Sequence, residues 1–486
     1  MNKLFVSARA LLAASVLSLS APLAVAQEEV ATEPTLSEVA ATAAEAKLAG
    51  HNAWMLTSCA LVLFMTAPGL AMFYGGLVRK KNVLSVLMQC LFLMAWMTVL
   101  WALYGYSLAF GGDNADLGGK FNKWIGNTDY LFMNNVARTW DESTNAPMDP
   151  MAGVIPRYTH MLFQGMFFII TPALICGAFA ERMKFSAMLL FTTLWGTLVY
   201  CPLCHWVWGG GILAYGKDYA LGGGALDFAG GTVVHISSGV SALVCAVVIG
   251  RRRGWGIEDM RPHNLTYTAL GASMLWFGWF GFNAGSELAS DGLTSSAFAA
   301  THFSAAAGAI AWAFYEWIVR GKPSVLGTAS GAVAGLVCIT PAAGFVQPMP
   351  ALLMGASAGV ICALACSKLK SAFGYDDSLD AFGVHGVGGT LGAILTGVFA
   401  TRACWNIADG KPLGLVEVIQ TEAGGWGASV MNGQVVAVLV TWVYSIVATL
   451  ILLKIVDAVV GLRVSQEGEQ IGLDLDQHEE EGYILQ

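Results

Sequence analysis

Long stretches of apolar residues, almost free of charged side chains, recur along the whole chain and restrict the folds open to it. A helix of about 20 residues crosses the ~30 Å apolar core of a bilayer, and the sequence contains eleven stretches of about this length. Charged residues make up 12% of the chain, about half of their share in a soluble domain. The sequence therefore predicts an all-α polytopic membrane protein.

The distribution of basic residues predicts how these spans are oriented. Basic clusters follow the odd-numbered spans, whereas the loops after even-numbered spans are poor in Lys and Arg. Short cytoplasmic loops carry an excess of Lys and Arg. We therefore expect a protein of the cytoplasmic (inner) membrane, with its N-terminus outside and its C-terminus in the cytoplasm. The eleven expected transmembrane helices cover residues 53–77, 84–109, 158–180, 185–209, 231–250, 265–287, 297–319, 325–343, 350–367, 383–401 and 433–458.

The two ends of the chain differ from the membrane domain expected over residues 51–462. Residues 1–26 have a basic start, an apolar core and an Ala-Val-Ala ending, which is the pattern of a cleaved signal peptide. Residues 27–50 are acidic and rich in alanine, and we interpret them as an external leader. Residues 463–486 are predicted to form an acidic cytoplasmic tail.

Two spans open with an acid that is followed by a histidine. Asp227 precedes His235 at the start of the fifth span, and Asp380 precedes His385 at the start of the tenth. Segments five spans apart run in opposite directions, as in an inverted five-plus-five repeat with one extra C-terminal helix. Straight helices would place the two histidines on opposite sides of the membrane. The glycines around them permit broken helices that enter the membrane part-way, and the sequence alone leaves open whether the histidines meet.

The expected chemistry of this pair is hydrogen bonding. Facing imidazoles stay neutral when one ring N–H donates to the bare nitrogen of the other, and their free edges can bind a small polar molecule. Two imidazoles without a Cys, Asp or Glu ligand make a poor zinc site, so we predict no metal and no cofactor. Asp227 is expected to cap the helix that follows it and to attract cations secondarily; Asp380 is assigned a similar structural or electrostatic role.

A different function is suggested by Cys201-Pro-Leu-Cys204-His205, which matches the attachment pattern of c-type haem. The motif lies inside an apolar span and leads directly into a Trp- and Gly-rich segment, which leaves little room for a haem. A haem redox protein is therefore a rival hypothesis only. No basic stripe indicates a nucleic-acid partner.

Aromatic side chains and one serine converge on the outer ends of three spans. Trp208 ends the fourth span, while Phe282 and Ser286 lie one turn apart at the end of the sixth. Phe163 and Phe167 lie one turn apart at the start of the third. Aromatic faces attract small cations, and a serine hydroxyl accepts a hydrogen bond from them. These residues predict an external cation site, although such aromatics are also common as packing residues.

The sequences of residues 60–79, 227–235, 278–286 and 382–387 resemble those of the Amt/MEP/Rh ammonium transporter family, in its bacterial Amt branch. The resemblance covers about residues 51–476. It implies that Trp208, Phe163, Phe167 and Ser286 recruit ammonium, with Trp279 nearby, and that Phe167 and Phe282 form a gate. It also implies that His235 and His385 line the pore, that Asp227 is structural, and that the protein is a homotrimer which a cytosolic PII signalling protein blocks.

The function that we expect is therefore transport and not catalysis. NH4+, with methylammonium as an analogue, would be recruited outside and deprotonated, and NH3 would pass the histidines while the proton is carried separately. A passive NH3 channel and an ammonium sensor of the same fold are the alternatives; no output domain follows Ser465, which argues against a fused sensor. The long loop of residues 111–157 and the acidic ending Glu479–Glu481 depart from the bacterial branch.

Overall fold

The computed structural model describes residues 34–113, 120–405 and 411–483. The predicted signal peptide lies outside the described residues. The contacts divide the chain into two units, residues 1–47 and residues 48–486. The described part of the first unit is the exposed beginning of helix α2 (Leu36–Phe64). Thr35 starts this helix, since its hydroxyl accepts the Glu38 N–H while the Glu38 carboxylate accepts the Thr35 N–H.

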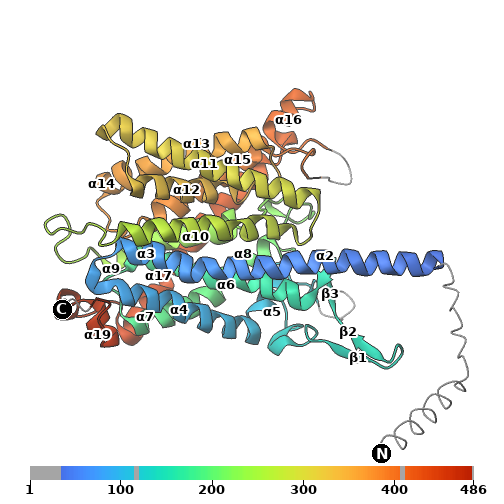
Figure 1. The fold of residues 1–486 in the computed structure, drawn as a ribbon, viewed down its shortest axis with the longest axis horizontal. Helices are drawn as coiled ribbons and strands as arrows, with labels where there is room; N and C mark the ends of the chain where they lie inside the picture. Colours follow the sequence, from blue (N-terminus) through green and yellow to red (C-terminus); the bar gives the residue numbers. More distant parts are fainter. Residues whose placement is uncertain (1–33, 114–119, 406–410, 484–486) are drawn as a thin grey trace, which may run out of the picture. The chain divides into compact units, whose positions relative to one another are not determined.

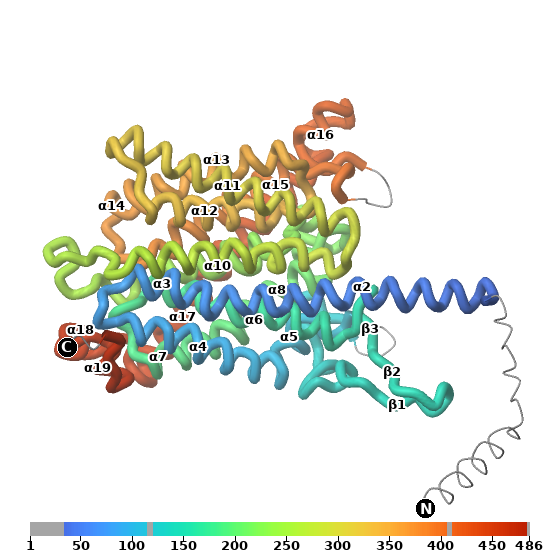
Figure 2. The backbone as a smooth tube through the Cα atoms, viewed as in Figure 1, coloured from blue at the N-terminus to red at the C-terminus, as the bar shows by residue number. Residues whose placement is uncertain are grey.

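The second unit contains long helices that lie alongside one another (Figures 1 and 2). Its first half contains α3 (Ala71–Leu77), α4 (Val83–Leu100), α5 (Tyr106–Phe110), α6 (Arg157–Phe179), α7 (Phe185–Trp195), α8 (Cys201–Val207) and α9 (Ser237–Ile249). Its second half contains α10 (Leu265–Ala284), α11 (Gly292–Arg320), α12 (Val325–Ile339), α13 (Pro348–Leu364), α14 (Lys370–Phe373), α15 (Val387–Phe399), α16 (Leu415–Gln420) and α17 (Met431–Val460). Short wide helical turns extend several of these helices, among them η8 (Gly231–Ile236) and η11 (Phe382–Gly386).

Nine helical segments within the described ranges are long and apolar enough to cross a membrane. Each of them overlaps one of the expected spans. The other two expected spans are helical as well: α10 is long enough but less apolar, and α12 has only 15 residues. At 1.5 Å per residue α12 rises about 22 Å, and the chain continues as a fully buried turn through residues 340–346. The multi-pass helical architecture is therefore confirmed.

The two histidine-bearing helices cross in direct backbone contact. A Cβ atom on Gly239 of α9 would lie 2.0 Å from the amide nitrogen of Gly386 in η11, so only glycine fits there. A buried non-helical segment, residues 225–230, leads into η8 and ends at Gly230 with φ +114°, a conformation that favours glycine. The glycine pattern predicted such non-helical entries, and they bring the histidines together.

The long loop between α5 and α6 carries the strands of the protein that are described. Strand β1 (Thr139–Asp141) pairs antiparallel with β2 (Ala146–Met148), and β3 (Met151–Ala152) pairs with β4 (Ile155–Pro156). The loop is anchored where Arg157, at the start of α6, pairs with Asp113 at 3.0 Å. This loop lies at the opposite end of the bundle from the C-terminal helices (Figure 1).

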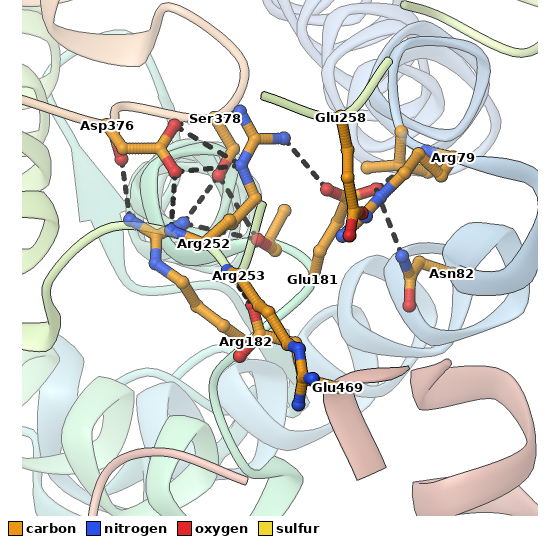
Figure 3. Close-up of polar contacts among 12 residues, drawn as sticks. Arg79, Asn82, Glu181, Arg182, Arg252, Arg253, Glu258, Asp376, Ser378 and Glu469 are labelled. Atoms are coloured by element: carbon orange, nitrogen blue, oxygen red, sulfur yellow. Dashed lines mark hydrogen bonds and ion pairs between the residues drawn. The ribbon is translucent and has the colours of Figure 1, made fainter. Parts of the chain in front are cut away.

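A buried set of charged side chains, which we call the inner charge cluster, joins four interhelical loops (Figure 3). Arg252, after α9, contacts Glu181, after α6, at 2.8 Å and holds Asp376, after α14, through two atoms of its guanidinium group. Glu181 also accepts the backbone N–H of Arg79, after α3, at 2.7 Å. The side chains of Glu181 and Asp376 are 0% exposed, so each carboxylate depends on these donors.

The C-terminal tail contains α18 (Gln466–Ile471) and α19 (Leu473–His478). It packs on the end of the bundle that carries the inner charge cluster (Figure 2). Its side chains cap other helices: Asp474 accepts the Ser85 N–H at the start of α4, and Gln477 accepts the Phe185 N–H at the start of α7. Glu469 accepts the Arg253 N–H and pairs with Arg463, each at 2.7 Å. Several acids of the tail therefore face the bundle, while residues 479–481 are exposed.

Candidate functional site

A cavity of about 680 Å³ opens beside the long loop and is walled by α6, the end of α8 and the segment before η8. Three of the predicted recruitment residues line it, namely Trp208, Ser286 and Phe167. The Trp208 indole N–H donates to the Asp227 carbonyl oxygen at 2.8 Å, which fixes the ring. The Ser286 hydroxyl donates to the Phe282 carbonyl oxygen at 2.8 Å. Its oxygen lone pairs therefore remain available to accept from a cation.

The other two predicted recruitment residues lie outside the cavity wall. Phe163 is fully buried and packs edge-on against Phe167, with the ring centroids 5.0 Å apart. Trp279 lies deeper and stacks on His235 at 5.5 Å and 23°, and its indole N–H donates to the Thr340 hydroxyl. These two residues support the neighbours of the cavity and do not face it.

Gln164 is a polar residue of the cavity wall that was not identified from the sequence. Gln164 lines the cavity, its side chain is 7% exposed, and its Oε1 atom has no hydrogen-bond partner among the described residues. A buried amide oxygen without a donor is costly, so a cationic donor in the cavity would satisfy it. The signal in the sequence is the position of this amide between Phe163 and Phe167, the two phenylalanines predicted to recruit the cation.

Phe167, which lines this cavity, packs against Phe282, which does not line it. Their ring centroids lie 4.5 Å apart and the planes are inclined by 54°, so the pair is tilted and not parallel. Both side chains are 1% exposed. Immediately beyond, Phe282 stacks on His235 at 5.9 Å and 20°. The cavity, the phenylalanine pair and the first histidine thus follow one another.

The two histidines are in hydrogen-bond contact. The Nδ1 atoms of His235 and His385 lie 3.2 Å apart, with the ring planes inclined by 18°. One proton shared between these nitrogens leaves both rings neutral. His235 Nε2 has no partner among the described residues, and no group of three His, Cys, Asp or Glu side chains in the described parts could hold a metal ion. The free ring edge is suited to hydrogen bonding a small neutral molecule.

A second cavity, of about 290 Å³, begins on the far side of the histidines. It is lined by His385 together with Tyr74, Arg252, Lys370 and Asp380, among others. It therefore lies at the end of the bundle where the inner charge cluster and the C-terminal tail are found. The histidine pair separates the two cavities.

Asp227 occupies the position that the capping prediction requires. Its Oδ1 atom accepts the N–H groups of Gly230 and Gly231, and its Oδ2 atom accepts those of Thr232 and Val233 as well as the Thr232 hydroxyl. These donors are Gly230, just before η8, and the first three residues of η8, where helix N–H groups lack partners inside the helix. The carboxylate therefore holds the backbone that carries His235.

Asp380 does not have the corresponding position in the second half. It adopts φ +59°, its side chain is 40% exposed, and it pairs with Lys370 at 2.8 Å. The carboxylate that accepts a backbone N–H of η11 is instead Asp377, whose Oδ2 atom lies 2.8 Å from the Phe382 nitrogen. The signal in the sequence is the spacing, since Asp227 and Asp377 both lie eight residues before a histidine.

The cysteine motif cannot hold a haem in this fold. Cys201 and Cys204 are fully buried within the bundle. Both ring nitrogens of His205 are already used, at 2.9 Å from the Ala109 carbonyl oxygen and 2.6 Å from the Asn122 carbonyl oxygen. The residues present therefore do not fit the group, and the motif is explained by packing.

Several known proteins are similar to this chain in sequence and fold. Residues 53–483 match the model of the Ammonium Transporter Family. A Bacillus subtilis protein named ammonium transporter is 46% identical over 87% of this chain and 96% of its own; Archaeoglobus fulgidus ammonium transporter Amt1 is 41% identical over 89% and 99%. The crystal structure of Saccharomyces cerevisiae Mep2 has a TM-score of 0.72 at 33% identity, covering 86% of this chain and 88% of Mep2. The chain belongs to the ammonium transporter family.

Proposed function

We propose that the chain carries ammonium from the outside of a cytoplasmic membrane to the cytoplasm. The observation that supports this most directly is a series of four features. The cavity lined by Trp208, which we call the outer cavity, is followed by the phenylalanine pair, by the histidine pair and by the cavity lined by His385, which we call the inner cavity. The names of the 41–46% identical relatives point to the same substrate.

NH4+ is recruited in the outer cavity by cation–π attraction to Trp208 and Phe167 and by hydrogen bonds to Ser286. The Gln164 oxygen adds an acceptor. Because the phenylalanine pair and the neutral histidines offer no counter-charge, a desolvated cation is costly beyond this point. Deprotonation before the constriction removes that cost. NH3 then passes the histidine edges, and the proton follows a separate route.

The membrane arrangement in this proposal has eleven helices, the N-terminus outside and the C-terminus in the cytoplasm, with an inverted five-plus-five repeat and one extra helix. The basic clusters support the orientation. The proposed assembly is a homotrimer with one pathway per subunit, in the inner membrane, with a cytosolic PII signalling protein as partner. Membership of the family supports the trimer and PII.

Purified protein in proteoliposomes tests the transport function. An ammonium pulse on a solid-supported membrane should produce a transient current, and an equal pulse of potassium should produce a much smaller one. Methylammonium should give a smaller current and compete with ammonium. Alkalinisation of the lumen without current would favour the passive NH3 channel, and the absence of both signals would favour a sensor.

The histidine pair is expected to set selectivity more than stability. Replacing His235 and His385 together by leucine removes two neutral groups and leaves no buried charge without a partner, so assembly should survive. Loss of the hydrogen bond to the permeating molecule, worth ~1 kcal/mol, should lower the ratio of ammonium to potassium current by roughly fivefold or more. Size-exclusion chromatography and the current ratio check this. A double variant that assembles and keeps both selectivity and pH dependence would count against a role of the histidines in separating the proton from ammonium.

A further inference from the structure

The two halves of the chain place equivalent acids before their histidines. Asp227 lies eight residues before His235, and Asp377 lies eight residues before His385. Each acid accepts the N–H of the residue five positions further on, Thr232 at 2.9 Å and Phe382 at 2.8 Å. Asp377 is therefore the counterpart of Asp227 on the side of the inner cavity.

The two acids differ in how completely they are hydrogen-bonded. Both oxygens of Asp227 accept hydrogen bonds, and the Thr232 hydroxyl is one of the donors. The matching residue after Asp377 is Phe382, which has no hydroxyl. Asp377 Oδ1 has no hydrogen-bond partner among the described residues, and Asp377 is only 1% exposed, so water does not replace the missing donor. A charged oxygen in that state is costly, and a bound proton removes the cost.

Asp377 adjoins the inner cavity through its neighbours. Lys370 Nζ donates to the Asp377 carbonyl oxygen at 2.6 Å and to the Asp380 carboxylate at 2.8 Å. Lys370, Ser378 and Asp380 all line the cavity beside His385. The other titratable groups near Asp377 are a cation, two phenols and two thiols, of which the phenols and thiols carry no charge at neutral pH. They are Arg182, Tyr74, Tyr375, Cys245 and Cys366.

We propose that Asp377 is the proton-exchange group at the cytoplasmic end of the proton's route. It binds on Oδ1 a proton that has been separated from ammonium and releases it to water in the inner cavity. The step moves one proton and no electrons: an O–H bond forms at Oδ1 on arrival, and it breaks when water accepts the proton and restores the carboxylate. This inference rests on the proposed function, in which NH3 and the proton travel separately.

The protonation behaviour of Asp377 supports this placement. Burial raises the pKa of Asp377 to about 6, the Lys370 ammonium opposes the rise, and Asp380 adds to it. A group with such a pKa exchanges its proton readily near neutral pH. When the cytoplasmic pH is below this pKa, Asp377 stays protonated, and release of the proton to the inner cavity should slow.

Inside-out giant patches with ammonium chloride in the pipette test this, because the cytoplasmic pH can be set directly. The wild-type current should fall as the cytoplasmic pH is lowered through about 6. Asp377→Asn keeps an acceptor for the Phe382 N–H but cannot titrate. The current of this variant should be at least about tenfold smaller than that of the wild type, and its plot against cytoplasmic pH should lose the inflection. The external methylammonium concentration that gives half-maximal current should stay within about twofold of the wild-type value, because the outer cavity is unchanged.

Two neighbouring variants give a signature that does not depend on the folding of Asp377→Asn. Lys370→Met removes a cation that lowers the pKa of Asp377, so the inflection should move to higher pH. Asp380→Asn removes an anion that raises it, so the inflection should move to lower pH. Asp259→Asn, in an exposed ion pair of another loop, is the matched control and should cause no shift.

The outcomes separate this inference from the proposed function. A wild-type protein that takes up ammonium without current overturns the separate proton route and this inference with it. If the wild type carries current, an assembled Asp377→Asn protein with full current and an unchanged inflection overturns the role of Asp377 alone. Shifts of equal sign in the Lys370 and Asp380 variants, or no shifts, overturn it as well.

Discussion

Arg252→Met is expected to lower the free energy of unfolding by about 3–5 kcal/mol, the cost of leaving buried charges without a partner. Arg252 contacts both Glu181 and Asp376, and its own side chain is 7% exposed. Methionine keeps most of the apolar stem, so the loss reports the charge and not the volume. Reversible unfolding in mixed detergent micelles measures the difference.

Two further variants make this expectation specific. Arg261→Met removes an arginine that is 86% exposed and paired with Asp259 at 2.6 Å; exposed pairs contribute ~0–1 kcal/mol, so little change is expected. Adding Glu181→Gln and Asp376→Asn to Arg252→Met removes the orphaned charges and should recover part of the loss. A triple variant no more stable than Arg252→Met would show that the charges are not the cause.

The loss of unfolding free energy in Arg252→Met should be smaller at low pH than at neutral pH. Burial opposes the charge of Glu181, but the Arg252 and Arg79 guanidinium groups outweigh it and hold its pKa below the usual 4.5. Burial and Arg252 act on the pKa of Asp376 in the same way. A lowered carboxyl pKa contributes stability above the unfolded pKa, and this is lost as the pH falls through the folded pKa. In Arg252→Met the guanidinium group is gone, so burial raises the pKa values of Glu181 and Asp376 in the folded protein. The difference in free energy of unfolding between the wild type and Arg252→Met should therefore become smaller as the pH falls from 7 to about 5.

The sequence predicts best what is encoded within one continuous segment. Apolar length predicts the spans, and the acid and histidine of residues 227–235 lie within one short stretch, so both were identified without a structure. The glycines at 239 and 386 allow the helix crossing, but their contact joins residues far apart in the chain. The sequence therefore left open whether His235 and His385 meet, because their contact depends on packing that no single segment contains.

What the sequence did not predict depends on packing between distant segments. Glu181 and Arg252 lie 71 residues apart, and Arg252 and Asp376 lie 124 apart, so neither pair leaves a local pattern. Trp279 and Phe163 are aromatic residues near the outer ends of spans, like Trp208, and only the packing shows that they face away from the cavity. The capping of α4 and α7 by the tail could not be predicted either, because nothing in the sequence around Asp474 and Gln477 indicates which distant backbone N–H groups they accept.

Asp227→Ala is expected to abolish most uptake, because it removes every side-chain acceptor at the start of η8. Four backbone N–H groups would lose their partner, and each buried unsatisfied donor costs about 1–3 kcal/mol. The segment of residues 225–230, which holds the Trp208 indole through the Asp227 carbonyl oxygen, would shift with them. Both the outer cavity and His235 would then be misplaced.

Asp227→Asn separates this structural role from direct binding of the cation by charge. Asparagine keeps one oxygen that can accept the N–H groups of Gly230 and Gly231, but its NH2 group faces the donors of Thr232 and Val233. Uptake should therefore be intermediate between wild type and alanine. Thr232→Val removes one donor and leaves the carboxylate in place, so it should stay close to wild type. Uptake of labelled methylammonium by equal amounts of membrane-inserted protein ranks the four; equal loss in Asn and Ala would mean that the charge binds the cation, because both substitutions remove it.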